Sequence, residues 1–350
     1  MHPAYRSAPY HHHGVLVKRS LRWILPALPL VGLGAFVGWK SWRIAQELVD
    51  PPFYRAQPLA RVEATYRDLA KGSDGDPGGV WTKESVENLE LWRLRRLTPA
   101  PGVVLLLHGF GDDRWGTSPA LKWFPGLDAV IFTYRRRDDA QRTGALVPPV
   151  TFGVEEAKEV VQVVHHLEAS GLPRRRILLM GRSLGASVGL LALAVLEREG
   201  KGRLGGVIWE GAPASSYSFA ERLVRGPQDR WWHLLAPAIG SLAAWCAGRM
   251  GNYDPAATDL LLRTRGLRFA TPSLCFLATQ DRLAPPAVQR TLASQFLDTQ
   301  VVEVPTWHLH CSEVLGPAYT LAIRQATQVW LSPIQNDQPK RGPVRPRSES

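Results

Sequence analysis

Cysteine is scarce in this sequence, with three residues in 350, at Cys246, Cys275 and Cys311. The three form no C-x-x-C pair and no spacing typical of a zinc site, so we expect no bound metal. So small and odd a number also excludes a disulfide framework, although a single disulfide among the three stays open. Cysteine usage therefore leaves the redox compartment undecided.

The sequence also lacks the basic pattern that nucleic-acid binders carry. Its net charge is +11, but the excess collects in the N-terminal segment, in Arg174–Arg176 and in the C-terminal tail. No recognition motif and no interleaving with aromatic residues accompanies these charges. We therefore expect no nucleic-acid partner, and interpret the charges as solvated or as flanking a membrane segment.

Internal repeats are absent, and the composition is ordinary for a globular protein, with 45% hydrophobic and 21% charged residues. The length allows one large α/β domain of about 250 residues together with appendages. Thirteen tryptophans favour a large core or an aromatic-lined cleft.

A charge-free apolar segment, Trp23–Trp39, lies near the N-terminus between basic flanks. As a helix it would span roughly 26 Å, slightly less than the hydrocarbon core of a bilayer, and its terminal tryptophans match the interfacial aromatic belt. We predict a cytoplasmic basic arm over residues 1–22 and a transmembrane signal anchor over residues 23–42, with the rest of the chain on the extracytoplasmic side. A cleaved signal peptide stays open, although no A-x-A-like site follows the segment.

The remaining sequence is interpreted as a juxtamembrane stem over residues 43–84, a globular domain over residues 85–331 and a disordered tail over residues 332–350. Residues 87–96 alternate apolar and polar positions, as in a half-buried antiparallel strand. Six apolar runs predict strands buried on both faces: residues 103–107, 129–134, 177–180, 206–209, 274–278 and 301–304. Helical patterns alternate with them, which predicts a mainly parallel, doubly wound sheet. The long interval over residues 214–270 predicts a helical cap.

A single serine stands between two glycines in Met180–Ala186, MGRSLGA, directly after a predicted buried strand. A sharp turn from strand to helix leaves no room for side chains two residues before and after the serine, which explains Gly181 and Gly185. This context predicts that Ser183 is a nucleophile, for which it needs a base, an orienting acid and an oxyanion hole.

Candidates for these partners follow in the order acid, then histidine. Asp281 comes just after the predicted strand 274–278, whereas Asp254 and Asp259 follow no buried strand. His308 and His310 both follow the last strand; we prefer His308 as the base and keep His310 as the alternative. The glycine-rich turn His108–Gly111 follows an early strand, so the backbone N–H groups of Phe110 and Leu184 are the expected oxyanion donors.

Together, HGFG, GRSLGA, ATQDRLAP and a late histidine make the chain from about residue 85 to 331 resemble the α/β-hydrolase superfamily. The chain is most similar to bacterial membrane-anchored serine hydrolases of the serine aminopeptidase-like and lysophospholipase-like branch. Their turn before the first long helix is matched by Phe152, Gly153, Glu156 and Glu159 in FGVEEAKE, and the spacing to Tyr319 favours His308. Two departures are FTYRRRDDAQRTG after the fourth strand and PTW before the histidine, which keeps His310 open.

The resemblance implies an α/β-hydrolase fold with a small helical cap, and a hydrolase without metal or organic cofactor. An ester, a thioester or an amide all fit this machinery. The membrane segment and Trp231, Trp232 and Trp245 in the predicted cap favour a lipophilic acyl substrate. A membrane-anchored peptidase-like hydrolase and a catalytically inactive binding protein with this fold are the alternatives.

Overall fold

A computed structural model of the protein describes residues 14–52, 54, 56, 58–71, 78–226 and 231–332. Residues 1–13 of the predicted arm and residues 333–350 of the predicted tail lie outside this range. In the first helix the side chains are described from Pro29 onward.

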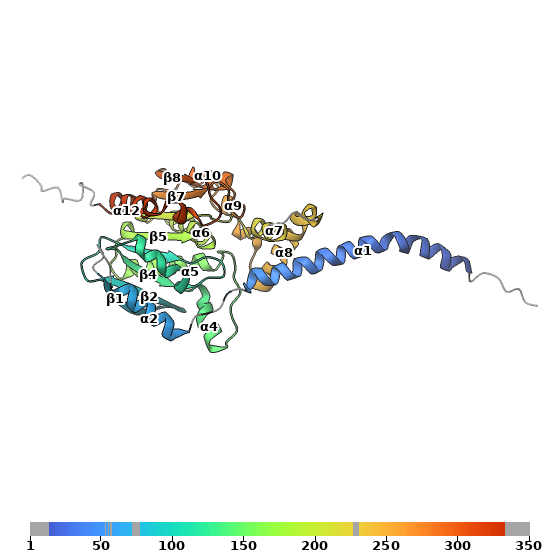
Figure 1. Ribbon diagram of the computed structural model, residues 1–350, viewed down its shortest axis with the longest axis horizontal. Helices are drawn as coiled ribbons and strands as arrows, with labels where there is room; N and C mark the ends of the chain where they lie inside the picture. The colour runs from blue at the N-terminus through green and yellow to red at the C-terminus, as the bar shows by residue number, and fades with distance from the viewer. Residues whose placement is uncertain are drawn as a thin grey trace, which may run out of the picture.

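An eight-stranded sheet with the order β1-β2-β4-β3-β5-β6-β7-β8 forms the centre of the domain (Figure 1). β1 and β2 pair antiparallel, as do β2 and β4, and all the other pairs are parallel. The mainly parallel, doubly wound sheet predicted from the sequence is therefore confirmed. The strands are β1 (Gly79–Val86), β2 (Leu89–Arg96), β3 (Val103–Leu107), β4 (Asp128–Phe132), β5 (Ile177–Arg182), β6 (Gly206–Glu210), β7 (Ser273–Ala278) and β8 (Thr299–Val304).

The central strands are buried on both faces, because successive side chains of a strand point to opposite sides of the sheet. In β3, Val103, Leu105 and Leu107 join the core under α5 (Glu156–Ala169) and α6 (Leu184–Arg198). Val104 and Leu106 join the second core, under η1 (Ser118–Trp123) and α12 (Pro317–Leu331). This two-sided burial explains why the sequence shows unbroken apolar runs rather than alternation.

Short elements complete the domain around this sheet. They are α3 (Arg114–Thr117), η2 (Tyr134–Arg136), α4 (Arg137–Thr143), η3 (Arg174–Arg176), α10 (Pro286–Ala293) and α11 (Cys311–Leu315).

The folded domain begins upstream of the predicted boundary at residue 85. β1 pairs with β2 along its whole length, from Gly79 opposite Arg96 to Val86 opposite Leu89. Before it, α2 (Leu59–Ala70) buries Tyr66 against the rings of Trp81 and Trp92, at centroid distances of 4.9 and 4.5 Å. Much of the predicted stem is thus part of the domain. The sequence before β1 is polar and rich in turn residues, and for this reason the edge strand was not predicted. Pairing with β2 stabilises it.

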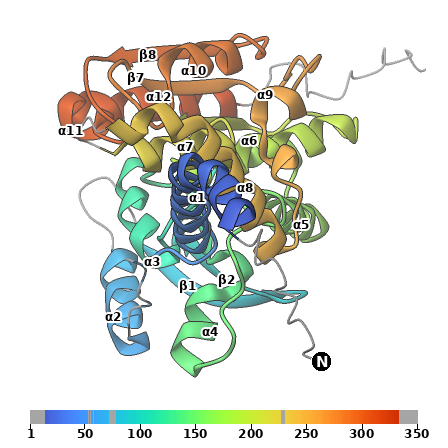
Figure 2. The ribbon, with the colours of Figure 1, turned by 90° about the vertical axis from the view of Figure 1, so that its right-hand side faces the viewer.

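Helices fill the interval between β6 and β7, where the sequence predicted a cap. They are α7 (Ser216–Arg225), η4 (Trp231–Leu235), α8 (Ala236–Gly251), η5 (Pro255–Thr258) and α9 (Leu260–Arg263). The first helix of the chain, α1 (Gly14–Val49), packs its C-terminal part on α8: Ser41 Oγ donates a hydrogen bond to the Ile239 carbonyl at 3.1 Å. Ile44, Ala45 and Leu48 are buried there. Figures 1 and 2 show α1 beside the cap helices and running outward from the domain.

Within the residues whose side chains are described, no helix combines the length and the hydropathy that a membrane span requires. For α1 these residues begin at Pro29, so the first part of the predicted span over residues 23–42 lies outside them.

Candidate active site

Ser183 occupies the turn between β5 and α6, in a strained backbone conformation with φ +53° and ψ −127°. A Cβ atom added at Gly181 would lie 2.3 Å from the Gly185 carbonyl oxygen, and one added at Gly185 would lie 2.1 Å from that of Leu107. Both glycines are therefore required by direct backbone contact. This is the steric reason that the sequence motif predicted.

Asp281 and His308 lie next to Ser183 and are connected to it by hydrogen bonds. The distance from His308 Nδ1 to Asp281 Oδ2 is 2.6 Å, and that from His308 Nε2 to Ser183 Oγ is 3.0 Å. The other oxygen of Asp281 accepts the backbone N–H groups of Leu283 and Ala284 at 2.8 and 2.9 Å, which fixes the carboxylate. The structure brings together the three residues that the sequence singled out.

The alternative residues lie elsewhere. His310 Nδ1 is 2.7 Å from Glu313 Oε2, in an exposed pair at the start of α11. Asp254 and Asp259 accept the backbone N–H groups of Ala256 and Leu262, which makes them caps of the short helices η5 and α9. Of the two candidate histidines, only His308 is hydrogen-bonded to Ser183 within the described residues.

The glycine-rich turn after β3 passes directly beside the serine. A Cβ added at Gly109 would lie 3.7 Å from Ser183 Cβ and 3.5 Å from the Arg182 carbonyl oxygen. Leu184 is the first residue of α6, where a backbone N–H group has no acceptor within the helix. The two segments that carry the predicted oxyanion donors, Phe110 and Leu184, are therefore adjacent.

His108 holds this turn as a neutral side chain. Its Nε2 accepts the backbone N–H of Tyr134 at 3.1 Å, so the proton is assigned to Nδ1, which lies 3.0 Å from the Gly109 carbonyl oxygen. Burial lowers the pKa of His108 to about 4. The histidine of HGFG is thus a fixed part of the scaffold, tying the turn to the end of β4.

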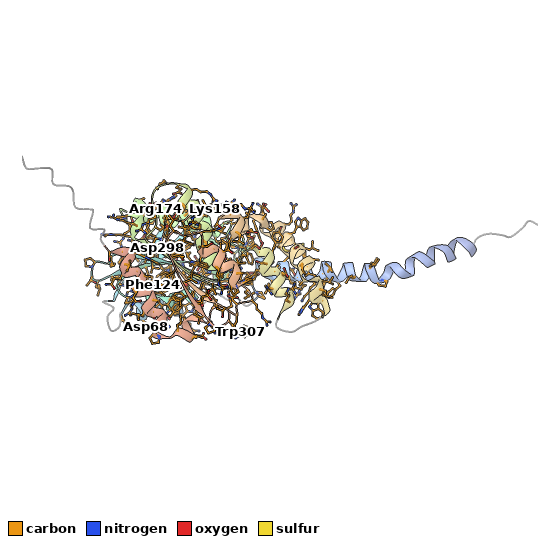
Figure 3. All side chains as sticks on the ribbon, turned by 90° about the horizontal axis from the view of Figure 1, so that it is seen from above. Asp68, Phe124, Lys158, Arg174, Asp298 and Trp307 are labelled. Carbon is orange, nitrogen blue, oxygen red and sulfur yellow. The ribbon has the colours of Figure 1, made fainter. Side chains whose placement is uncertain are left out.

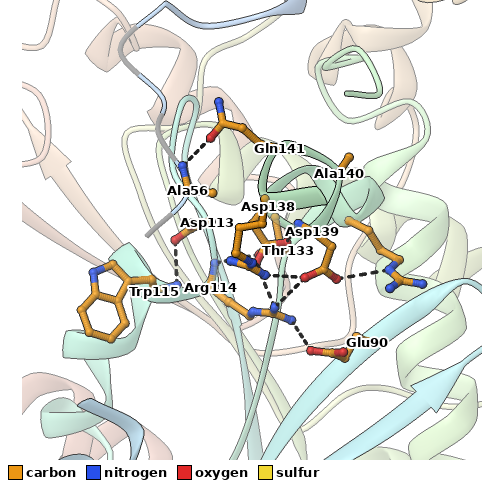
Figure 4. A network of polar contacts seen from close by, with 12 residues as sticks. Ala56, Glu90, Asp113, Arg114, Trp115, Thr133, Asp138, Asp139, Ala140 and Gln141 are labelled. Atoms are coloured by element: carbon orange, nitrogen blue, oxygen red, sulfur yellow. Dashed lines mark hydrogen bonds and ion pairs between the residues drawn. The ribbon is translucent and has the colours of Figure 1, made fainter. Parts of the chain in front are cut away.

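A buried polar network fixes the segment that follows the turn (Figure 4). Arg114 pairs with Glu90 at 3.0 Å, with Asp138 at 2.9 Å and with Asp139 at 3.3 Å. Asp113 caps α3 by accepting the backbone N–H groups of the next turn, and burial raises its pKa. The segment after the turn is thereby tied to β2 and α4.

Three phenylalanine rings pack together next to the glycine-rich turn. The ring of Phe110 lies 5.4 Å from Phe152 and 5.1 Å from Phe219, which belongs to the cap helix α7. Phe152 and Phe219 are 5.3 Å apart. The cap is therefore joined to the turn beside Ser183 by an apolar aromatic cluster.

The motif FGVEEAKE has a structural part in the same region. Glu156 accepts the backbone N–H groups of Thr151 and Gly153, both at 2.8 Å. Glu159 accepts the backbone N–H of Arg135 at 3.0 and 3.2 Å, in a turn after β4 where Arg135 has φ +55°. These carboxyl groups fix the backbone of the loop before α5 and of the turn after β4.

Sequence reasoning missed Glu210, a fully buried carboxylate at the end of β6, and its partner Arg182, which precedes Ser183. Asp281 was found because a carboxylate follows a buried strand. The same signal was present in GVIWE, where Glu210 ends an apolar run.

All three cysteines are free thiols, so the disulfide that the sequence left open does not form. In the described part of the chain no group of His, Cys, Asp and Glu side chains is arranged to hold a metal ion.

Comparison with known proteins supports this architecture. No family model matches the chain, and no curated protein matches its sequence. Among solved structures it is similar to an α/β hydrolase from Vibrio vulnificus, with 14% identity and a TM-score of 0.57 over 81% of this chain and 92% of that one. An esterase from Pyrococcus furiosus has 14% identity and a TM-score of 0.55 over 72% and 92% of the two chains. An esterase/lipase from an uncultured bacterium has 16% identity and a TM-score of 0.51 over 84% and 97%.

The chain therefore has the α/β-hydrolase fold, as the sequence motifs predicted. At these identities the likeness establishes the fold, and the chemistry has to be argued from the site itself.

Proposed function

We propose that this protein is a serine hydrolase that cleaves carboxylic esters through an acyl-enzyme intermediate. The observation that carries the proposal is the continuous hydrogen-bonded chain from Asp281 through His308 to Ser183, on a strained turn at the carboxyl end of a parallel sheet. The names of the similar esterase structures favour an ester over an amide.

In the first step Ser183 Oγ attacks the substrate carbonyl carbon while His308 Nε2 takes the hydroxyl proton. Asp281 holds the imidazole with its proton on Nδ1 and stabilises the imidazolium that forms. The backbone N–H groups of Phe110 and Leu184 stabilise the negative charge on the carbonyl oxygen. His308 then gives its proton to the leaving alcohol, and the acyl group stays on Ser183.

In the second step a water molecule replaces the alcohol. His308 removes a proton from the water as the oxygen attacks the acyl carbon, and returns it to Ser183 Oγ when the acid leaves. The residues of this chain supply every proton transfer in the cycle.

A lipophilic acyl group is the substrate that the surroundings favour. The cluster of Phe110, Phe152 and Phe219 places apolar rings beside the turn that carries the oxyanion donor. An acyl chain that packs against these rings is removed from water, which contributes about 0.8 kcal/mol for each buried CH₂ group.

Membrane anchorage through α1 completes the proposal, with the N-terminus inside and the catalytic domain on the extracytoplasmic side. The charge-free segment Trp23–Trp39 lies on α1, which runs outward past the cap (Figure 1), and Phe36 near its end packs on Trp232 of the cap at 6.4 Å. Leu30 and Val31 in this segment are 70% and 67% exposed, so the described part of the domain leaves most of their surface uncovered.

The enzyme function is tested with a fluorophosphonate probe and p-nitrophenyl esters. We expect the wild type to form an adduct and to hydrolyse the esters, Ser183→Ala to do neither, and His308→Ala to lose at least about 1,000-fold in kcat/KM. His310→Ala is the matched control, because its partner is the exposed Glu313. Full activity in Ser183→Ala would contradict the assignment, and an unreactive wild type would favour a binding protein with this fold.

A further inference from the structure

Glu210 connects the two loops that carry the serine and the histidine. Its Oε2 accepts Arg182 Nε at 2.9 Å, and its Oε1 accepts the backbone N–H of Cys311 at 3.1 Å, three residues after His308. Its own carbonyl oxygen accepts the backbone N–H of Ser183 at 2.9 Å. Glu210, which is fully buried, is thus hydrogen-bonded both to the segment that carries Ser183 and to the segment that follows His308.

Arg182 makes a second connection between the same loops. Its guanidinium donates one hydrogen bond to Glu210 and another to the carbonyl oxygen of Leu309, the residue after His308. Leu309 has φ +63°, a conformation that a leucine adopts only when its surroundings hold it there. Arg182 therefore links the residue before Ser183 to the strained residue after His308.

Aromatic side chains pack against this pair, in which Glu210 is fully buried and Arg182 is 30% exposed. Arg182 lies over the ring of Trp123 at 5.6 Å, and Trp123 lies 4.8 Å from the ring of Tyr319. The Tyr319 hydroxyl donates to Glu210 Oε2 at 3.1 Å, and burial together with the Glu210 charge raises the pKa of Tyr319, which keeps it a donor. Because Glu210 is fully buried, the charge-assisted hydrogen bonds that it accepts are costly to break.

His308 also packs directly on the residue that follows Glu210. Gly211 has φ +65°, and a Cβ added there would lie 2.9 Å from His308 Cε1. A displacement of the end of β6 would therefore move the imidazole as well as the loop.

From these contacts we infer that Arg182 and Glu210 are positioning residues of the hydrolase. They fix the position of the His308 loop relative to the Ser183 turn, so that the hydrogen bond between His308 Nε2 and Ser183 Oγ is formed before substrate binds. The inference rests on the proposed function, because it assigns a catalytic consequence to the alignment of Ser183 and His308.

A second arginine at the other end of the same strand provides a matched control. Arg174 precedes β5, whereas Arg182 ends it, and Arg174 pairs with Glu168 through two hydrogen bonds of 2.6 and 2.9 Å. Figure 3 places Arg174 far from Trp307, the neighbour of His308. A change at Arg174 or Glu168 tests the loss of a comparable ion pair away from the site.

The experiment compares Glu210→Gln and Arg182→Lys with Glu168→Gln and Arg174→Lys in the full chain. Glutamine keeps the size of Glu210 but loses the charge, and lysine presents a compact ammonium that cannot reach Glu210 and Leu309 together as the guanidinium fork does. Thermal unfolding first sets a temperature at which all five proteins are folded. Steady-state kinetics with a short p-nitrophenyl ester and the rate of fluorophosphonate labelling are then measured at that temperature.

We expect kcat and the labelling rate of Glu210→Gln to fall about 10- to 100-fold, with KM changed less than threefold, because the reacting groups lose alignment and not affinity. Arg182→Lys should lose less. The downfield Nδ1 proton signal of His308 should shift or broaden in both variants. Glu168→Gln and Arg174→Lys should keep wild-type kcat and the same signal.

Wild-type kcat in folded Glu210→Gln would overturn the positioning role while leaving the proposed function intact, and so would an equal loss in the Arg174 and Glu168 variants. A wild type that neither labels nor hydrolyses would overturn both.

Discussion

At the scale of single residues, buried carboxyl groups are used in two different ways around the site. Glu210 forms an ion pair with Arg182, with Nε and Oε2 2.9 Å apart. Glu159 instead binds a backbone turn, and burial raises its pKa to about 8. The first carboxyl group is held by a charged partner and a backbone N–H group, whereas burial favours the protonated form of the second.

Replacing Glu159 should therefore change how stability depends on pH. Its folded pKa of about 8 lies above the ordinary value of 4.5, so the folded state binds the proton more tightly. The stability that the protonated Glu159 contributes to the folded state is fully present below about pH 4.5 and is lost as the pH rises through 8. Relative to wild type, Glu159→Gln should gain stability from pH 5 to 8, by at most a few kcal/mol at about 1.4 kcal/mol per pKa unit.

Thermal unfolding of both proteins at several pH values measures this difference. Glu303→Gln is the control, since Glu303 forms an exposed pair with Arg290 at 2.8 Å. A constant difference in melting temperature across this pH range would contradict the argument.

At the scale of elements, α7 connects the cap to the active site. Phe219 extends from this helix to Phe110 on the glycine-rich turn, so the cap contacts the segment beside the proposed acyl site. The pair Phe269 and Phe296, with centroids 4.7 Å apart, is buried similarly but belongs to other loops.

Phe219→Ala should consequently change substrate preference. We expect kcat/KM for a long-chain p-nitrophenyl ester to fall about tenfold relative to the acetyl ester, because the longer acyl chain loses apolar contact. Phe296→Ala should cost about 3 kcal/mol of stability and leave the ratio unchanged. If the ratio of kcat/KM for the long-chain ester to that for the acetyl ester is the same in both variants, Phe219 does not contact the acyl chain.

At the scale of the whole molecule, α1 is continuous from its outward-running part to the portion buried on α8. The same helix therefore connects the proposed membrane segment with the cap, and the cap with the turn beside Ser183. Anchorage would hold the acyl site at a fixed distance from the bilayer.

Membrane attachment is measured by fractionation of the full chain. We expect the protein to need detergent for release and to stay bound in high salt and in alkaline carbonate. Leu30→Arg with Val31→Arg should release it, because each arginine costs about 2.5 to 3.5 kcal/mol within a span. Leu97→Arg with Leu297→Arg is the control, at residues 70% and 64% exposed. Release of the wild type by salt alone would contradict anchorage.

Labelling of spheroplasts with a membrane-impermeant fluorophosphonate then checks the orientation. Labelling of Ser183 before lysis is expected, and labelling only after lysis would place the domain inside.

The sequence predicted the strands of the parallel sheet, because strands buried on both faces need unbroken apolar runs. It predicted the turn at Ser183 because only glycine fits at positions 181 and 185, where backbone oxygens come within 2.3 Å of an added Cβ. It did not predict β1 or α2, whose apolar residues are few and become buried only when Tyr66, Trp81 and Trp92 meet.

Local chemistry, then, was determined by the sequence alone: a serine on a sharp turn, an acid after one strand and a histidine after another. Only the tertiary structure shows which of the two candidate histidines lies at Ser183. His308 Nε2 is 3.0 Å from Ser183 Oγ, whereas His310, two residues later, pairs with Glu313. The Arg182–Glu210 pair was likewise decided in three dimensions. The two residues come from the ends of β5 and β6, and their further partners from the segment after His308, and only the assembled sheet brings these within hydrogen-bonding distance.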